Sequence, residues 1–117
     1  MRVCFRSSVK PELIAEYRRR HAAVWPDMLR ALKDAGWTNY SLFLDGDGLL
    51  VGYLECDDFD AVRARMALTE VNSRWQAEMS SLFDNPDNPD QAPDEGFRVL
   101  EEVFNLDDQL AAAESTT

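Results

Sequence analysis

Two strand-like segments joined by a tight turn constrain the fold of this chain more than any other feature. Residues 37–45 alternate between two faces, and the apolar face carries Tyr40, Leu42 and Leu44. The Asp-Gly-Asp-Gly sequence at 45–48 is typical of a hairpin turn, and residues 49–56 are apolar enough to return as the paired strand. Gly52 indicates a bulge or a close approach of another group. The pattern therefore predicts an antiparallel hairpin.

A periodic helical segment precedes the hairpin. One face of it recurs at spacings of three and four and carries Leu13, Tyr17, His21, Val24, Met28 and Leu32. Pro11 marks its first turn, and Gly36 supplies a stop signal. Because Pro26 lacks a backbone N–H and crowds the preceding turn, we expect a kink or a restart near Trp25.

The remaining segments complete the order of elements. Residues 3–7 and 98–104 are predicted to be strands, and residues 57–67 and 69–83 to be helices. The second of these helices carries an inward face of Val71, Trp75, Met79 and Leu82. Residues 84–96 hold three of the five prolines and are predicted to form an extended loop.

The order strand, helix, strand, strand, helix, strand describes an α+β fold, a ferredoxin-like βαββαβ antiparallel sheet with its helices on one face. We expect one domain over residues 1–106 and a frayed, flexible tail over residues 107–117. Large side chains on both strand faces, such as Leu42 against Phe43, require a second cover. A homodimer that pairs two bare sheet faces would provide it.

Charge and cysteine content narrow the classes of function. The net charge of −10 disfavours nucleic acid and anionic membranes as partners, and no apolar run approaches the roughly 20 residues of a membrane span. Cys4 and Cys56 are too few for a disulfide framework or a zinc site, so we expect reduced thiols in the cytoplasm. The arginines at 18–20 point in different directions on a helix and predict a solvated face paired with acidic neighbours.

The acidic residues around the turn raise the question of a cation site. Asp45, Asp47, Asp57 and Asp58 lack the regular spacing and the closing glutamate of a calcium loop. We therefore expect turn and capping roles for them, and no bound metal.

The chain contains a single histidine, His21. Tyr17 lies four residues earlier and therefore on the same helical face, and Trp25 lies four residues later. On the residues alone, a histidine on an apolar helical face is more often a hydrogen-bonded core residue than a catalyst. Its unperturbed pKa of about 6.5 nevertheless suits proton transfer near neutral pH.

An ordered set of short motifs extends along the chain. It comprises Tyr17-Arg18-Arg19-Arg20-His21, Val24-Trp25-Pro26-Asp27, Asn39-Tyr40, Leu44-Asp45, Arg74-Trp75, Asn85-Pro86-Asp87-Asn88 and Glu102-Val103-Phe104. Over residues 1 to about 106, this set resembles the L-rhamnose mutarotase family. The resemblance implies a dimeric α/β barrel that interconverts the α and β anomers of a monosaccharide and uses no cofactor.

The resemblance also implies roles for individual residues. His21 matches the proton donor of the family, and the substrate-binding positions are matched by Tyr17, Tyr40, Trp75 and Gln76. Gln76 departs from the pattern, which has a second tryptophan there, and Asn105 stands where an aromatic ring or a histidine is common. L-Rhamnose is the first candidate substrate, with another deoxy sugar or a pentose as alternatives.

Other functions are compatible with the same architecture. A small haem- or oxygen-dependent monooxygenase could use a histidine to ligate iron, and a non-catalytic sugar-binding module could use it only for hydrogen bonding. For a mutarotase, the group that removes the anomeric proton stays open among Tyr17, an aspartate of residues 84–96 and water. Whether that loop completes its own pocket or the partner's is also open.

Overall fold

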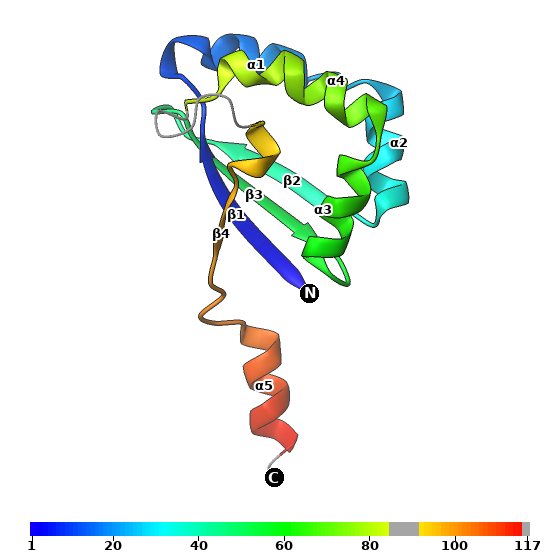
Figure 1. Ribbon diagram of the computed structural model, residues 1–117. Coiled ribbons are helices and arrows are strands. Elements are labelled where there is room, and N and C mark those ends of the chain that lie inside the picture. Colours follow the sequence, from blue (N-terminus) through cyan, green and yellow to red (C-terminus); the bar gives the residue numbers. More distant parts are fainter. Residues whose placement is uncertain (85–91, 116–117) are drawn as a thin grey trace.

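A four-stranded antiparallel sheet forms one layer of the molecule (Figure 1). The computed structural model describes residues 1–84 and 92–115. The strands are β1 (Arg2–Ser8), β2 (Thr38–Leu44), β3 (Leu49–Glu55) and β4 (Arg98–Leu100), in the order β2-β3-β1-β4. The predicted hairpin is confirmed as β2 and β3, and β1 pairs with β3 over its full length. The topology confirms the ferredoxin-like α+β fold.

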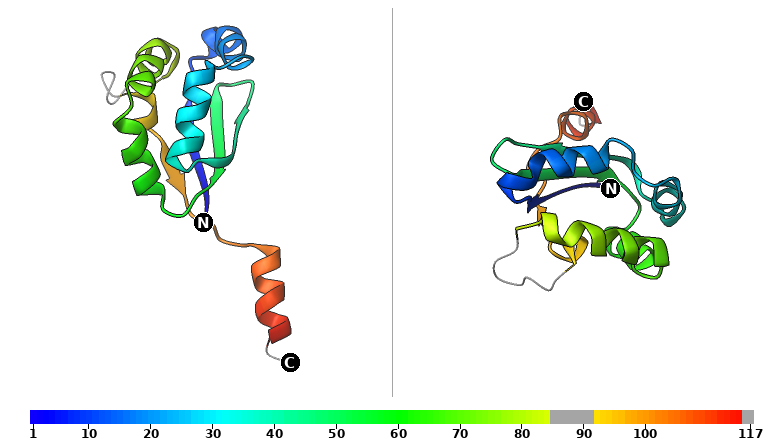
Figure 2. Two further views of the ribbon diagram at one scale, coloured as in Figure 1. Left: turned by 90° about the vertical axis from the view of Figure 1, so that its right-hand side faces the viewer. Right: turned by 90° about the horizontal axis from the view of Figure 1, so that it is seen from above.

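Helices cover one face of this sheet (Figure 2). They are α1 (Ile14–His21), α2 (Pro26–Ala35), α3 (Phe59–Ala67) and α4 (Glu70–Met79), with short 3-10 helices η1 (Pro11–Leu13), η2 (Ser80–Leu82) and η3 (Pro93–Glu95). A further helix, α5 (Leu106–Ser115), extends away from the sheet and its helical layer (Figure 1).

The expected restart beside Pro26 is confirmed. Helix α1 ends at His21, and Trp25 takes an extended conformation before Pro26 opens α2. Gly36 ends α2 with a φ of 102°, a left-handed conformation that glycine adopts without steric cost. Because the helix stops at His21, Trp25 does not continue the face that Tyr17 and His21 share, and this part of the prediction was wrong.

Phe5 occupies the centre of the core between sheet and helices. Its side chain is fully buried and lies in the space that a Cβ on Gly52 would fill, so the expected close approach at Gly52 is confirmed. Phe97 stacks on the Phe5 ring with centroids 3.9 Å apart. Tyr40 lies on the same side, 6.3 Å from Phe5. These three aromatic side chains form the sheet-side surface on which the helices pack; we call this surface the floor of the core.

Within the described residues, no helix packs against the other face of the sheet. Alternation places Phe43 and Val51 opposite each other on this face, with Tyr53 and Leu100 nearby through the strand register. Phe43 is 62% exposed. Both the bare face and its apolar character therefore agree with the sequence prediction.

Two predicted elements differ from the structure. Strand β4 ends at Leu100 rather than at residue 104, because the exposed residues that follow leave the sheet edge. Residues 107–115 are helical rather than frayed, since the Asn105 side chain accepts a hydrogen bond from the Asp108 amide and caps a segment of helix-forming residues. Most of the predicted loop, 85–91, lies outside the described residues. A single domain over residues 1–106 and the flexibility of the tail stay predictions.

Three of the four acidic residues, Asp45, Asp47 and Asp58, have the predicted turn and capping roles. Asp45 accepts a hydrogen bond from the Gly46 amide and Asp47 from the Leu49 amide, which fixes the turn. Asp58 caps α3 by accepting from the Ala61 amide. Within residues 1–84 and 92–115, no group of three or more potential metal ligands is present.

Replacing Gly52 by alanine tests the packing around Phe5. An alanine Cβ would lie 2.2 Å from the Phe5 ring, so the strand or the ring must move. We expect a loss of about 1–3 kcal/mol in the free energy of unfolding, the usual cost of overpacking a core. Urea denaturation would measure it. Gly46→Ala is the control, because no atom lies within 4 Å of the added Cβ; equal stability of the two variants would contradict the packing argument.

Candidate active site

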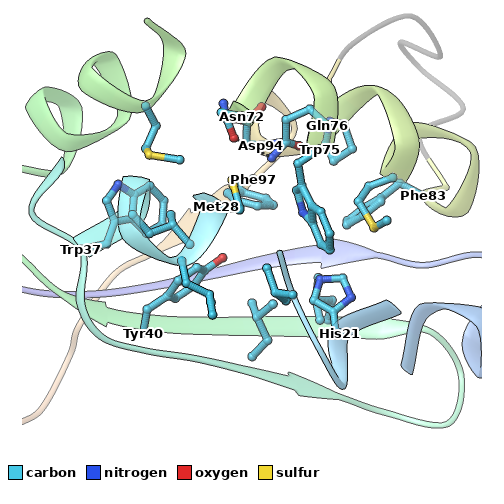
Figure 3. Close-up of a pocket in the computed structure, with 18 of the residues that line it drawn as sticks. His21, Met28, Trp37, Tyr40, Asn72, Trp75, Gln76, Phe83, Asp94 and Phe97 are labelled. Atoms are coloured by element: carbon cyan, nitrogen blue, oxygen red, sulfur yellow. Dashed lines mark hydrogen bonds between the residues drawn. The ribbon is translucent and has the colours of Figure 1, made fainter. Parts of the chain in front are cut away.

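A cavity of about 330 Å³ lies between the sheet and the helical layer (Figure 3). Its lining combines apolar and aromatic side chains with a few polar groups, which is the usual composition of a small-molecule site. The five residues singled out from the sequence all line it: Tyr17, His21, Tyr40, Trp75 and Gln76. Segments far apart in the chain therefore meet around one space.

His21 occupies one side of this cavity. Its ring stacks on Tyr17, with centroids 4.0 Å apart, and its Nδ1 lies 3.0 Å from the Tyr17 carbonyl oxygen. A carbonyl can only accept, so Nδ1 carries the proton and donates it in this bond. The neutral ring then keeps a lone pair on Nε2. Burial lowers the pKa of His21 below its ordinary value, so the neutral form prevails at neutral pH.

The two tyrosines of the cavity are held as neutral phenols. Burial raises the pKa of Tyr17, and burial raises the pKa of Tyr40 with a smaller contribution from nearby Tyr17 and Asp94. The Tyr40 hydroxyl points into the cavity (Figure 3). Neither side chain is a ready base near pH 7. Each offers a hydroxyl that can donate and accept hydrogen bonds.

Trp75 forms a wall beside the histidine. Its ring meets His21 edge to face, with centroids 5.4 Å apart, and meets Trp25 in the same way at 5.0 Å. Trp25 does not line the cavity and packs behind Trp75. Arg74 lies over the Trp25 ring at 5.8 Å. Trp75 is thus braced from behind and presents an aromatic surface to the cavity.

Gln76 belongs to a polar cluster that the sequence did not reveal. It donates to the Asn72 side chain and accepts from the backbone amide of Asp94. Asn72, which is 5% exposed, donates in turn to the Asp94 carboxylate. The only sequence signal was the four-residue spacing of Asn72 and Gln76 on one helical face. Asp94 lies in the predicted loop, and its position depends on contacts distant in sequence.

Asn105, the second departure from the family pattern, is not part of this cavity. Its side chain caps α5 instead. Arg19 and Arg20 pair with Glu16, which confirms the predicted solvated face of α1.

Comparison with known proteins shows the family to which this chain belongs. A family model for L-rhamnose mutarotase matches residues 2–106. The chain belongs to the L-rhamnose mutarotase family. It is 41% identical to the L-rhamnose mutarotase of Pectobacterium carotovorum over 108 residues, which span 92% of this chain and 99% of that protein. It is 45% identical to that of Bacillus subtilis over 94 residues, or 79% and 85% of the two chains.

Solved structures agree with this family assignment. The crystal structure of L-rhamnose mutarotase from Formosa agariphila matches with a TM-score of 0.72 and 27% identity, covering 91% of this chain and 98% of that one. The structure of Rv0793 from Mycobacterium tuberculosis matches with a TM-score of 0.54 and 17% identity, covering 89% and 95%, and shows the fold alone. Membership of the mutarotase family identifies the chain as an enzyme and does not favour the oxygenase or non-catalytic alternatives.

The protonation state of His21 can be measured directly. Because burial penalises the charged ring, we expect its pKa to lie below 6.5 and the Nδ1–H tautomer to prevail above that pH. A pH titration followed by ¹H–¹⁵N NMR of the imidazole would show both, and the signals are unambiguous because the chain has one histidine. A pKa above 6.5, or a dominant Nε2–H tautomer, would contradict the geometry.

Proposed function

We propose that this protein is a carbohydrate isomerase that interconverts the α and β anomers of L-rhamnose or a related deoxy sugar, with His21 moving the protons. The observation that carries the proposal is the neutral His21 ring, fixed through Nδ1 to the Tyr17 carbonyl and lining the cavity. A neutral sugar also suits a protein of net charge −10, which would repel nucleic acid and anionic membranes.

The reaction needs one proton removed and one delivered. Nε2 of His21 accepts the proton of the anomeric hydroxyl, the electron pair of that O–H bond forms the C1 carbonyl, and the C1–O5 bond breaks. The imidazolium then gives its proton to O5, so the open-chain aldehyde forms with no net gain or loss of atoms. Rotation about C1–C2 presents the other carbonyl face, and the reverse steps close the ring as the opposite anomer.

One histidine can serve both oxygens because both are attached to the same carbon. His21 is then the proton donor to the ring oxygen. It is also the base that removes the anomeric proton, the group that the sequence left open. The raised pKa of Tyr17 argues against that tyrosine as the base. The chemistry is proton transfer alone, which requires no redox or metal cofactor.

The other cavity residues hold the sugar. The Tyr17 and Tyr40 hydroxyls can bond sugar hydroxyl groups, while the Trp75 indole covers the C–H surface of the ring. Burial of the site also strengthens each polar contact by lowering the local dielectric constant. These roles agree with the positions that the family pattern assigns to substrate binding.

Replacing His21 by glutamine tests the proton transfer. Glutamine keeps a polar side chain but has no proton to exchange near neutral pH, so we expect anomer exchange to fall by about a hundredfold or more. Exchange can be measured by NMR magnetisation transfer between the α and β signals of L-rhamnose, with the uncatalysed rate subtracted.

Arg18→Gln is the matched control, since Arg18 lies on the exposed side of α1. It should leave the exchange rate unchanged. If His21→Gln retains the wild-type rate, another group moves the protons. If the wild-type protein accelerates exchange for none of L-rhamnose, other deoxy sugars and pentoses, the mutarotase function itself is wrong.

We also propose that the protein is a homodimer, which would close the dimeric α/β barrel. The bare sheet face supports this, because Phe43, Val51, Tyr53 and Leu100 would otherwise lie against water. The segment after β4 adds apolar side chains that the described residues leave exposed, including Phe104 and Leu106. A separate part of the proposal is a cytoplasmic location. The free thiols of Cys4 and Cys56 agree with such a reducing compartment.

Phe43→Asp tests this interface. Phe43 lies on the bare face of the edge strand β2, and a carboxylate there would lose its water when the two faces pair, so we expect the dimer to dissociate. Sedimentation velocity would report the change in mass. Leu68→Asp is the control, because Leu68 is 88% exposed and lies at the end of α3 on the helical side. A wild-type monomer, or a Phe43→Asp variant that stays dimeric, would oppose the proposal.

A further inference from the structure

Three hydrogen bonds hold Asp94 in the wall of the cavity. Its backbone amide donates to the Gln76 side chain at 3.2 Å, and its backbone carbonyl accepts from Arg63 at 2.8 Å. Its carboxylate oxygen Oδ2 accepts from Asn72 at 3.2 Å. Helix α3, through Arg63, and helix α4, through Asn72 and Gln76, therefore fix η3 against the cavity.

This fixation leaves part of the carboxylate unused. Among the described residues, no group bonds Oδ1 of Asp94. Asn72 Oδ1 accepts from the Gln76 side chain at 3.1 Å, and Gln76 Oε1 accepts from the Asp94 amide, so each amide oxygen already has a partner. Among the described residues, Asp94 is therefore the member of this cluster that presents a charged oxygen without a partner. Asp94 lines the cavity and lies on the side opposite His21 (Figure 3).

We propose that Asp94 anchors the sugar by accepting hydrogen bonds from hydroxyl groups on the ring edge opposite the anomeric carbon, and that Gln76 is the positioning residue that holds it there. This inference rests on the proposed mutarotase function. His21 must reach C1 and the ring oxygen, so a group across the cavity faces the hydroxyls at C3 and C4. Pyranoses with free hydroxyls at both positions are the substrate class.

The polar groups of the cluster suit hydrogen bonding to sugar hydroxyls better than apolar packing against the sugar ring. Sugar hydroxyls donate, and a carboxylate is the strongest acceptor that a side chain provides. Where the family pattern has a second tryptophan, Gln76 instead uses both ends of its amide to bind Asn72 and Asp94. The departure at position 76 thus exchanges an aromatic surface for a support that brings a carboxylate to the site.

Asp94→Asn tests the anchor. The asparagine oxygen can still accept from Asn72, while the charge is removed. We expect KM for L-rhamnose to rise at least about tenfold, the effect of weakening a hydrogen bond to a charged group, with kcat changing much less. The concentration dependence of NMR anomer exchange gives both constants. Asp34→Asn, on the exposed side of α2, is the control and should change neither.

Analogues of the sugar locate the contact. For 3-deoxy and 4-deoxy derivatives of L-rhamnose, one partner is already missing, so the effect of Asp94→Asn should shrink for at least one of them, as in a double-mutant cycle. An effect of equal size for all three sugars would overturn the assignment to these hydroxyls. An unchanged KM for L-rhamnose would overturn the anchor itself.

A variant of Gln76 tests the positioning role. Gln76→Leu removes both amide contacts and should raise KM like Asp94→Asn, with kcat changing much less. Equal melting temperatures would show that folding is not the cause. Unchanged KM in a folded Gln76→Leu variant would overturn the positioning role. These outcomes differ from a failure of the proposed function, in which the wild type accelerates exchange of no sugar.

Discussion

The contact of Phe5 with the backbone of Gly52 is the constraint on which the rest of the structure depends. Only a residue without a side chain lets the ring lie against β3, and the buried ring then supports Phe97 and Tyr40. The cavity lies above this floor. A bulkier residue at position 52 would displace the surface from which the Tyr40 hydroxyl reaches the site, so the stability of the sheet and the geometry of the pocket have a common origin.

Burial between sheet and helices also sets the proton chemistry of the cavity. The same loss of water lowers the pKa of His21 and raises that of Tyr17 and Tyr40, because it disfavours whichever form is charged. All three groups are therefore neutral at pH 7. A neutral histidine with its lone pair available and two neutral phenols form a site suited to a substrate that carries hydroxyl groups and no charge.

The two proposed roles, proton transfer and sugar anchoring, belong to opposite sides of the cavity. His21 lies on α1, where one local hydrogen bond fixes its ring, and we propose that it contacts the reacting end of the sugar. Asp94 is held by α3 and α4, and we propose that it contacts the other end. Since these groups come from different elements, the distance between them is fixed by how the helices pack on the sheet. Under this proposal, substrate preference depends on the packing of the helical layer.

The sequence by itself determined the hairpin, the restart at Pro26, the bare sheet face and five residues that line one cavity. Those features follow from local periodicity, from glycine and proline chemistry, and from motifs that resemble a known family. The cluster of Asn72, Gln76 and Asp94 was decided only by the tertiary structure, because its hydrogen bonds join residues up to 22 positions apart. The helix at 106–115 was missed although Asn105 carried its capping signal, since a segment rich in small residues resembles a frayed end. Local patterns predict which faces turn inward, whereas the partners of a polar group depend on how distant elements pack.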